Sequence, residues 1–237
     1  MRILFTSDSH SLQNEIPKQW LMEADAICHS GDICLKGSFQ EGHAFMEWFS
    51  ELPYKHKIFT VGNHDICFDP SHPRYKYFKQ DFDRVYPDKI GNIREIIPEN
   101  ITFLDNSSIE IDGLKFWGFP QTPEFYNWAF NVPRGAELAK FTDQIPLDTD
   151  VLLTHGPPQG ILDMTMRGEY VGCEELKNRL EEVKPLVHSF GHIHEARGVV
   201  KTEDTLFLNS SVVNLNYFVV NKPYLVEIDE NKIVTLL

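Results

Sequence analysis

Short apolar runs rich in β-branched and aromatic residues recur along the chain, and a polar turn follows most of them. In the first 65 residues such runs predict strands over residues 2–6, 24–29 and 57–61. Helices are expected between them, over residues 16–22 and 42–52; the second has Phe45, Phe49 and Leu52 at helical spacing. The strand, helix, strand order predicts parallel pairing.

The chain after residue 100 combines a hairpin with further buried strands. Asp112 and Gly113 form a strong hairpin signal between two of its runs, so antiparallel pairing is expected there. One helix is expected over residues 173–183, where Leu176, Leu180 and Val183 share a face. The predicted strands cover residues 101–104, 108–111, 114–118, 150–154, 186–190, 198–201, 206–209, 224–228 and 233–236. Two sheets packed face to face with helices outside would accommodate them all.

Two segments have weaker patterns. Residues 68–98 mix aromatic and charged side chains and suggest a helix-containing insertion or cap. Residues 119–133 form an aromatic loop that ends next to Arg134. Its rings could stack on a base while Arg134 contacts a phosphate, or they could pack inward, which is the commoner outcome for such loops.

Composition excludes several classes of protein. The 237 residues are 42% hydrophobic and 24% charged and contain no Pro/Gly/Ser-rich linker, so a single domain over residues 1–237 is expected. A net charge of -13 argues against duplex nucleic acid or an anionic membrane surface as partner. The four cysteines lack C-x-x-C spacing, and no signal-like or membrane-spanning stretch is visible, which predicts reduced thiols and a cytoplasmic protein.

The candidate chemistry lies at the strand ends. In open α/β sheets the carboxyl ends of the strands meet at one edge, so polar residues there converge. The expected metal ligands are oxygen and nitrogen donors without sulfur, a set that suits two divalent cations such as Mn, Fe or Zn. They are Asp8, His10, Asp32, Asn63, His155, His192 and His194. Asp32 is the natural bridge, while His188 lies inside a strand and is expected to be structural.

Five ordered motifs resemble those of the calcineurin-like metallophosphoesterases. They are Asp8-Ser9-His10, Gly31-Asp32, Gly62-Asn63-His64-Asp65, His155-Gly156-Pro157-Pro158 and Gly191-His192-Ile193-His194. The resemblance implies a four-layer α/β/β/α sandwich. It implies one cation held by Asp8, His10, Asp32 and His194 and another held by Asp32, Asn63, His155 and His192. It also makes His64 catalytic and not a ligand.

The resemblance narrows to the metallophosphoesterase-domain-containing branch. The segments that carry it are residues 52–54, 131–135, 154–158 and 171–173. One member of that branch has Gly in place of His192, a departure that this chain does not share. The serine/threonine phosphatases of the superfamily carry an Asp-Arg pair after the bridging Asp, and Cys34-Leu35-Lys36-Gly37 does not match it. A protein phosphatase is therefore disfavoured.

The expected activity is hydrolysis of small phosphodiesters by a hydroxide that bridges the two cations, with cyclic nucleotides suggested by the branch. His64 would donate a proton to the leaving alkoxide while Asp65 keeps the imidazole oriented. A phosphomonoesterase or nucleotidase and a nucleotide pyrophosphatase use the same metals and stay open, as do the substrate and the oligomeric state. A nuclease is less favoured because no basic groove is evident. A non-enzymatic scaffold with this fold is a remote alternative, since the chain keeps all seven ligands.

Overall fold

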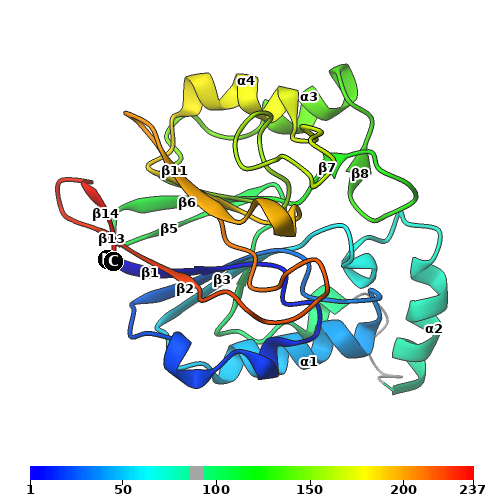
Figure 1. Cartoon of the computed structure of the whole chain (residues 1–237). Helices are drawn as coiled ribbons and strands as arrows, with labels where there is room; N and C mark the ends of the chain where they lie inside the picture. The colour runs from blue at the N-terminus through cyan, green and yellow to red at the C-terminus, as the bar shows by residue number, and fades with distance from the viewer. Residues whose placement is uncertain (86–92) are drawn as a thin grey trace.

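Two six-stranded sheets lie face to face at the centre of the molecule and helices cover both outer faces (Figure 1). This computed structural model describes residues 1–85 and 93–237. The arrangement is the four-layer α/β/β/α sandwich, so the predicted fold class is confirmed.

The first sheet has the strand order β14-β13-β1-β2-β3-β4. Strands β1, β2, β3 and β4 are parallel, and β13 and β14 extend the sheet by antiparallel pairing. The bounds are β1 Arg2–Thr6, β2 Ala26–Ser30, β3 His56–Thr60, β4 Thr102–Phe103, β13 Tyr224–Ile228 and β14 Val234–Leu236. The C-terminal strands therefore share a sheet with the first strand of the chain.

The second sheet has the strand order β11-β12-β10-β9-β6-β5. Strands β12, β10, β9 and β6 are parallel, while β5 with β6 and β11 with β12 form antiparallel edge pairs. The bounds are β5 Ser107–Ile111, β6 Leu114–Phe119, β9 Val151–Thr154, β10 Val187–Phe190, β11 Gly198–Lys201 and β12 Leu206–Asn209. The expected hairpin at Asp112 and Gly113 joins β5 to β6.

Alternation along the strands divides the apolar side chains between layers. In β1, Ile3 and Phe5 enter the core between the sheets, and Leu4 enters the core beneath the helices of the first sheet. Period-two alternation of this kind places successive side chains on opposite faces, and because both faces of β1 are covered, apolar residues stand at successive positions along it.

The helices lie in two outer layers. Helix α1 (Phe39–Glu51) covers the first sheet, and α2 (Tyr75–Val85) stands beside the end of α1 and packs against it (Figure 1). Helices α3 (Ala136–Thr142) and α4 (Glu174–Val183) cover the second sheet. Ser38 caps the start of α1: its side chain accepts a hydrogen bond from the Glu41 amide, and the Glu41 carboxylate accepts one from the Ser38 amide. This capping box fixes the start of the helix directly after the loop that follows Asp32.

The prediction of a helix over residues 16–22 is wrong. Two 3₁₀ helices, Gln13–Glu15 and Lys18–Trp20, occupy this connection. Pro17 explains the break between them, because a residue that precedes proline is pushed out of the helical region, and Ile16 has an extended backbone with a ψ of 117°.

The remaining differences are local. The segment 68–98 contains 3₁₀ turns and α2, with residues 86–92 outside the described part. Helix α3 and the two-residue strands β7 (Thr122–Pro123) and β8 (Asn131–Val132) were not expected. Across residues 1–85 and 93–237, no helix is long and apolar enough to cross a membrane. The cytoplasmic location and the single domain over residues 1–237 stay predictions.

Candidate metal centre

The polar residues at the strand ends stand on left-handed turns. Asp8, His10, Asp32 and His192 have φ angles of 53°, 42°, 54° and 67°. Side chains other than glycine rarely adopt this conformation, and it concentrates at functional sites. Close packing reinforces the turns: a Cβ atom at Gly191 would collide with the Asp8 carboxylate.

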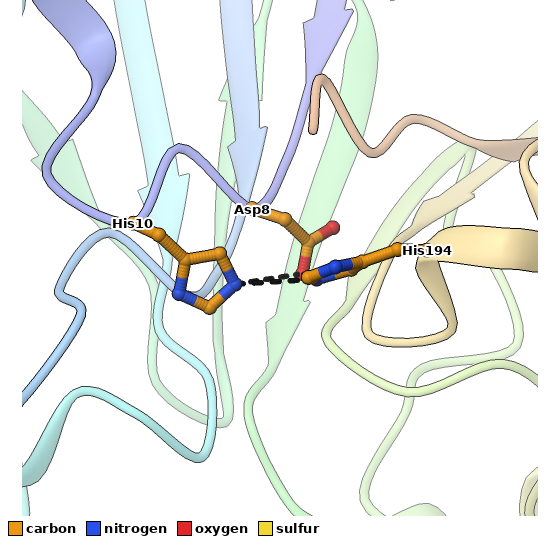
Figure 2. A group of neighbouring side chains, drawn as sticks. All are labelled: Asp8, His10 and His194. Atoms are coloured by element: carbon orange, nitrogen blue, oxygen red, sulfur yellow. Dashed lines mark hydrogen bonds and ion pairs between the residues drawn. The ribbon is translucent and has the colours of Figure 1, made fainter. Parts of the chain in front are cut away.

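Asp8, His10 and His194 form the first group (Figure 2). His10 Nε2 lies 3.2 Å from His194 Nε2, and His194 Nε2 lies 3.4 Å from Asp8 Oδ1. Figure 2 shows the two rings pointing toward one another with the Asp8 carboxylate beside them. The residues come from the end of β1 and from the 3₁₀ helix His194–Ala196, so the two sheets both contribute.

Asp32, His155 and His192 form the second group. His155 Nε2 lies 3.3 Å from Asp32 Oδ2 and 2.9 Å from Asn63 Oδ1, so the amide of Asn63 belongs to this group as well. His155 follows β9 and Asp32 follows β2, which again brings both sheets together.

Asp32 connects the two groups. Its Oδ2 atom lies 3.6 Å from His10 Nε2 and 3.3 Å from His155 Nε2. Its other oxygen accepts a hydrogen bond of 2.8 Å from the His64 amide. One carboxylate oxygen therefore faces an imidazole of each group while the other is fixed by the main chain.

Main-chain carbonyl groups fix which ring nitrogen of His10 and His155 faces the carboxylates. His10 Nδ1 donates to the Cys34 carbonyl at 3.0 Å, and His155 Nδ1 donates to the Ser30 carbonyl at 3.0 Å. Carbonyl oxygens only accept hydrogen bonds, so Nε2 is the nitrogen of each ring that faces the carboxylates. Metal-binding histidines commonly donate their other ring N–H to a carbonyl oxygen in this way.

The pKa values keep both carboxylates ionised. Burial alone would raise the pKa of Asp8, but the hydrogen bond and charge of His194 outweigh it and hold the pKa below its ordinary value. His155 does the same for Asp32 against the effect of burial, and the Asp32 charge in turn raises the pKa of His155 to about 9. Burial lowers the pKa of His10 to about 4 and that of His192 to about 3.

His64 lies beside the two groups. One of its ring nitrogens is within 4.8 Å of ligand atoms of His10 and Asp32. Its Nδ1 donates to the Leu35 carbonyl at 2.7 Å. The prediction that Asp65 orients this ring is wrong, because the Asp65 carboxylate accepts hydrogen bonds from the amides of Gly62 at 2.7 Å and Cys34 at 2.8 Å. Asp65 thus joins the loops that carry Asn63 and Asp32.

Arg134 lies on the wall of a cavity next to the second group. The cavity has a volume of about 470 Å³, and His192 is among its lining residues. The Arg134 guanidinium donates to the carbonyls of Val171 at 2.7 Å and Gly172 at 2.8 Å. Phe125 and Tyr126 also line the cavity and are exposed. The inward packing considered for the aromatic loop therefore does not hold for these two rings.

Sequence reasoning missed three contacts of the site. They are the Leu35 carbonyl on His64, the Trp128 ring stacked on His64, and the Tyr217 ring 4.9 Å from His10. A carbonyl contact leaves no side-chain signal in a sequence. The rings come from loops distant in the sequence from their partners.

His188 is a structural histidine, as expected. It is fully buried in β10, and its Nε2 lies 2.8 Å from the Thr154 hydroxyl. That hydroxyl donates to the Gly156 carbonyl at 2.7 Å, so His188 Nε2 is the donor of the other bond.

The profile of the Calcineurin-like phosphoesterase family matches residues 1–196. The chain belongs to this family. A protein of Thermus thermophilus, TT1561, shares the fold with a TM-score of 0.62 at 15% identity, over 99% of this chain and 97% of that one.

Individual relatives identify the branch. The chain is 36% identical over 235 residues to the human Metallophosphoesterase domain-containing protein 1, covering 96% of this chain and 71% of that protein. The mouse protein of the same name gives the same values. The predicted membership of this branch is confirmed. Family and candidate ligand groups together indicate a metal-dependent phosphoester hydrolase.

Proposed function

We propose that the chain is a dinuclear metal-dependent phosphodiesterase that hydrolyses small phosphodiesters, cyclic nucleotides among them. The observation that carries the proposal is the position of Asp32 Oδ2, 3.6 Å from His10 Nε2 and 3.3 Å from His155 Nε2. A carboxylate oxygen that faces an imidazole of each group would suit a ligand shared by two cations.

The donor set fits divalent metals. We assign Asp8, His10, Asp32 and His194 to one cation and Asp32, Asn63, His155 and His192 to the other. Imidazole nitrogens with carboxylate and amide oxygens suit Mn, Fe or Zn. When bound, two such cations supply Lewis-acid stabilisation of the phosphoryl oxygens and a nucleophilic water near neutral pH.

His64 is proposed as the proton donor. Its Nδ1 is engaged by the Leu35 carbonyl, so Nε2 is the nitrogen that remains available to a substrate. In the form of His64 that carries a hydrogen on both ring nitrogens, the leaving oxygen would take the Nε2 proton as its bond to phosphorus breaks, and solvent would then restore it. Asp65 contributes by holding the loops of Gly62 and Cys34 together.

The cavity supports a nucleotide as substrate. Its volume of about 470 Å³ lies in the range of small-molecule sites, and His192 connects it to the second ligand group. Exposed rings of Phe125 and Tyr126 offer stacking surfaces for a base. Arg134 donates two of its five N–H groups to main-chain carbonyls, and its other N–H groups could donate to a phosphate oxygen.

The test compares bis(p-nitrophenyl) phosphate, p-nitrophenyl phosphate and a panel of cyclic nucleotides with added Mn²⁺. The variants are Asp32→Asn and the matched control Asp112→Asn. The control makes the same change in the turn between β5 and β6. This turn lies at the start of β6, whereas the site lies near the other end of that strand, where it pairs with the end of β9. We expect diester cleavage that is lost in Asp32→Asn and retained in the control. Cleavage of the monoester alone would indicate a phosphomonoesterase or nucleotidase. Absence of both activities with two metals bound would indicate a non-enzymatic scaffold.

A further inference from the structure

The imidazole of His64 is stacked on the indole of Trp128. The ring centroids are 4.3 Å apart with an interplanar angle of 22°. His10 contacts the same imidazole edge-on, with centroids 4.7 Å apart and an angle of 80°. The ring of His64 is therefore restrained by two aromatic neighbours in addition to its hydrogen bond with Leu35.

Hydrogen bonds hold the loop around Trp128 on both sides. The Ala129 amide donates to the Asn63 carbonyl at 3.1 Å, and the Phe130 amide donates to the Asp69 carboxylate at 3.0 Å. Ala129 is fully buried. The loop is thus attached to Asn63, the residue that precedes His64. This attachment fixes the backbone that carries the indole relative to the backbone that carries the imidazole.

A third anchor precedes Trp128. Buried His72 accepts a hydrogen bond from the Arg74 amide at its Nδ1, so its Nε2 carries the hydrogen and donates to the Asn127 carbonyl at 3.1 Å. The Arg74 guanidinium also lies over the Trp128 ring, 5.4 Å from its centroid. Residues 127, 129 and 130 are therefore all fixed, and the indole between them has little freedom to move.

The stack controls a motion that the hydrogen bond alone permits. His64 is half-buried, and a single bond from Nδ1 to the Leu35 carbonyl lets the ring rock about that contact. A parallel indole at 4.3 Å blocks such rocking on the face it covers. By holding this plane, the indole keeps Nδ1 at the Leu35 carbonyl, and that hydrogen bond sets the tautomer with the hydrogen on Nδ1.

We propose that Trp128 is a positioning residue that fixes the plane and tautomer of the His64 imidazole, so that Nε2 faces the site. Its catalytic consequence rests on the role of His64 in the proposed function. The positioning itself does not, and it is open to a measurement without substrate.

The first test is ¹⁵N-resolved NMR of the histidine side chains in zinc-loaded protein at mildly alkaline pH. In the wild type we expect a single His64 tautomer with the hydrogen on Nδ1. In Trp128→Leu we expect averaged or broadened His64 signals, with Trp128→Phe restoring a single tautomer. An unchanged single tautomer in Trp128→Leu would overturn the proposal, whatever the protein hydrolyses.

The second test is kinetic. A proton donor matters most when the leaving group is poor, so diphenyl phosphate and bis(p-nitrophenyl) phosphate are compared. We expect Trp128→Leu to lower kcat for the phenyl diester about tenfold more than for the nitrophenyl diester, at unchanged metal content. In a His64→Ala background the same change should have no further selective effect.

The outcomes separate the two proposals. If the wild type cleaves neither diester, the proposed function fails and the NMR result alone decides the position of His64. If the wild type is active and Trp128→Leu slows both diesters equally, or adds its full effect to His64→Ala, the positioning role of Trp128 is wrong.

Discussion

At the residue scale, the site depends on backbone conformations that most side chains avoid. Asp8, His10, Asp32 and His192 all have positive φ, each at a cost of about 1 kcal/mol or more. These turns bring side chains from separate strands to within hydrogen-bond distance of one another. The closest packing is at Gly191, where the loop from β10 touches the Asp8 carboxylate.

Gly191→Ala should therefore disable the metal centre. The added methyl group would collide with Asp8 and with the Ser7 hydroxyl, so the loop carrying His192 must move. We expect loss of at least one bound cation per chain by elemental analysis. The matched control is Gly198→Ala in β11, whose Cβ would meet the tip of Leu162 at 3.0 Å and should leave metal content intact. Full metal content in Gly191→Ala would contradict this description of the packing.

His64→Ala should separate catalysis from metal binding. Removing the proposed proton donor is expected to reduce kcat by about a hundredfold, a typical contribution of general acid catalysis. Metal content should stay at the wild-type level, since the ligand sets proposed here do not include His64. Equal turnover by the purified variant would remove His64 from the mechanism, and depleted metal would make it a ligand.

At the scale of single elements, β10 carries a buried histidine that links stability to pH. Burial lowers the pKa of His188 to about 3, so this imidazole stays neutral in the folded protein. In the unfolded chain it titrates near its ordinary value of 6.5. The unfolded state therefore binds a proton that the folded state does not, and stability falls as pH drops from about 6.5 toward about 3.

His188→Phe should weaken this pH dependence. At about pH 5, protonation of His188 in the unfolded chain lowers the free energy of unfolding of the wild type by about 2 kcal/mol relative to neutral pH. The variant has no histidine at this position and lacks this loss. The Thr154 hydroxyl keeps its bond to the Gly156 carbonyl, so no donor is stranded. Urea unfolding of both proteins at about pH 7 and about pH 5 measures the difference. Identical losses on acidification would show that His188 is not the group involved.

The elements that the sequence predicts well are those with strong local signals. Strands β1, β2 and β3 are short apolar runs ended by polar turns, and α1 has helical spacing, although the predicted start at residue 42 missed its first turn after Ser38. Weak signals explain the misses. Helix α3 has only seven residues, and its N-cap residue, Gly135, provides no side-chain cap. Pro17 interrupts the run over residues 16–22 that predicts a helix.

At the scale of the whole molecule, the site exists only because the two sheets meet at the carboxyl ends of their parallel strands. Asp8 and Asp32 come from the first sheet and His155 from the second. Sequence reasoning brings such residues together because the convergence of strand ends is a rule of α/β folds. It could not find the Leu35 carbonyl or Trp128 on His64, since these contacts depend on loop paths that no local pattern specifies.

The central claim is that one carboxylate, Asp32, links two cation sites, and the most direct measurement is metal stoichiometry by mass spectrometry of Mn²⁺-loaded protein. We predict two ions per chain in the wild type and in Asp112→Asn. We predict fewer in Asp32→Asn, because the amide lacks the charge that faces His10 and His155. Two full sites in Asp32→Asn, or a single ion in the wild type, would contradict the claim.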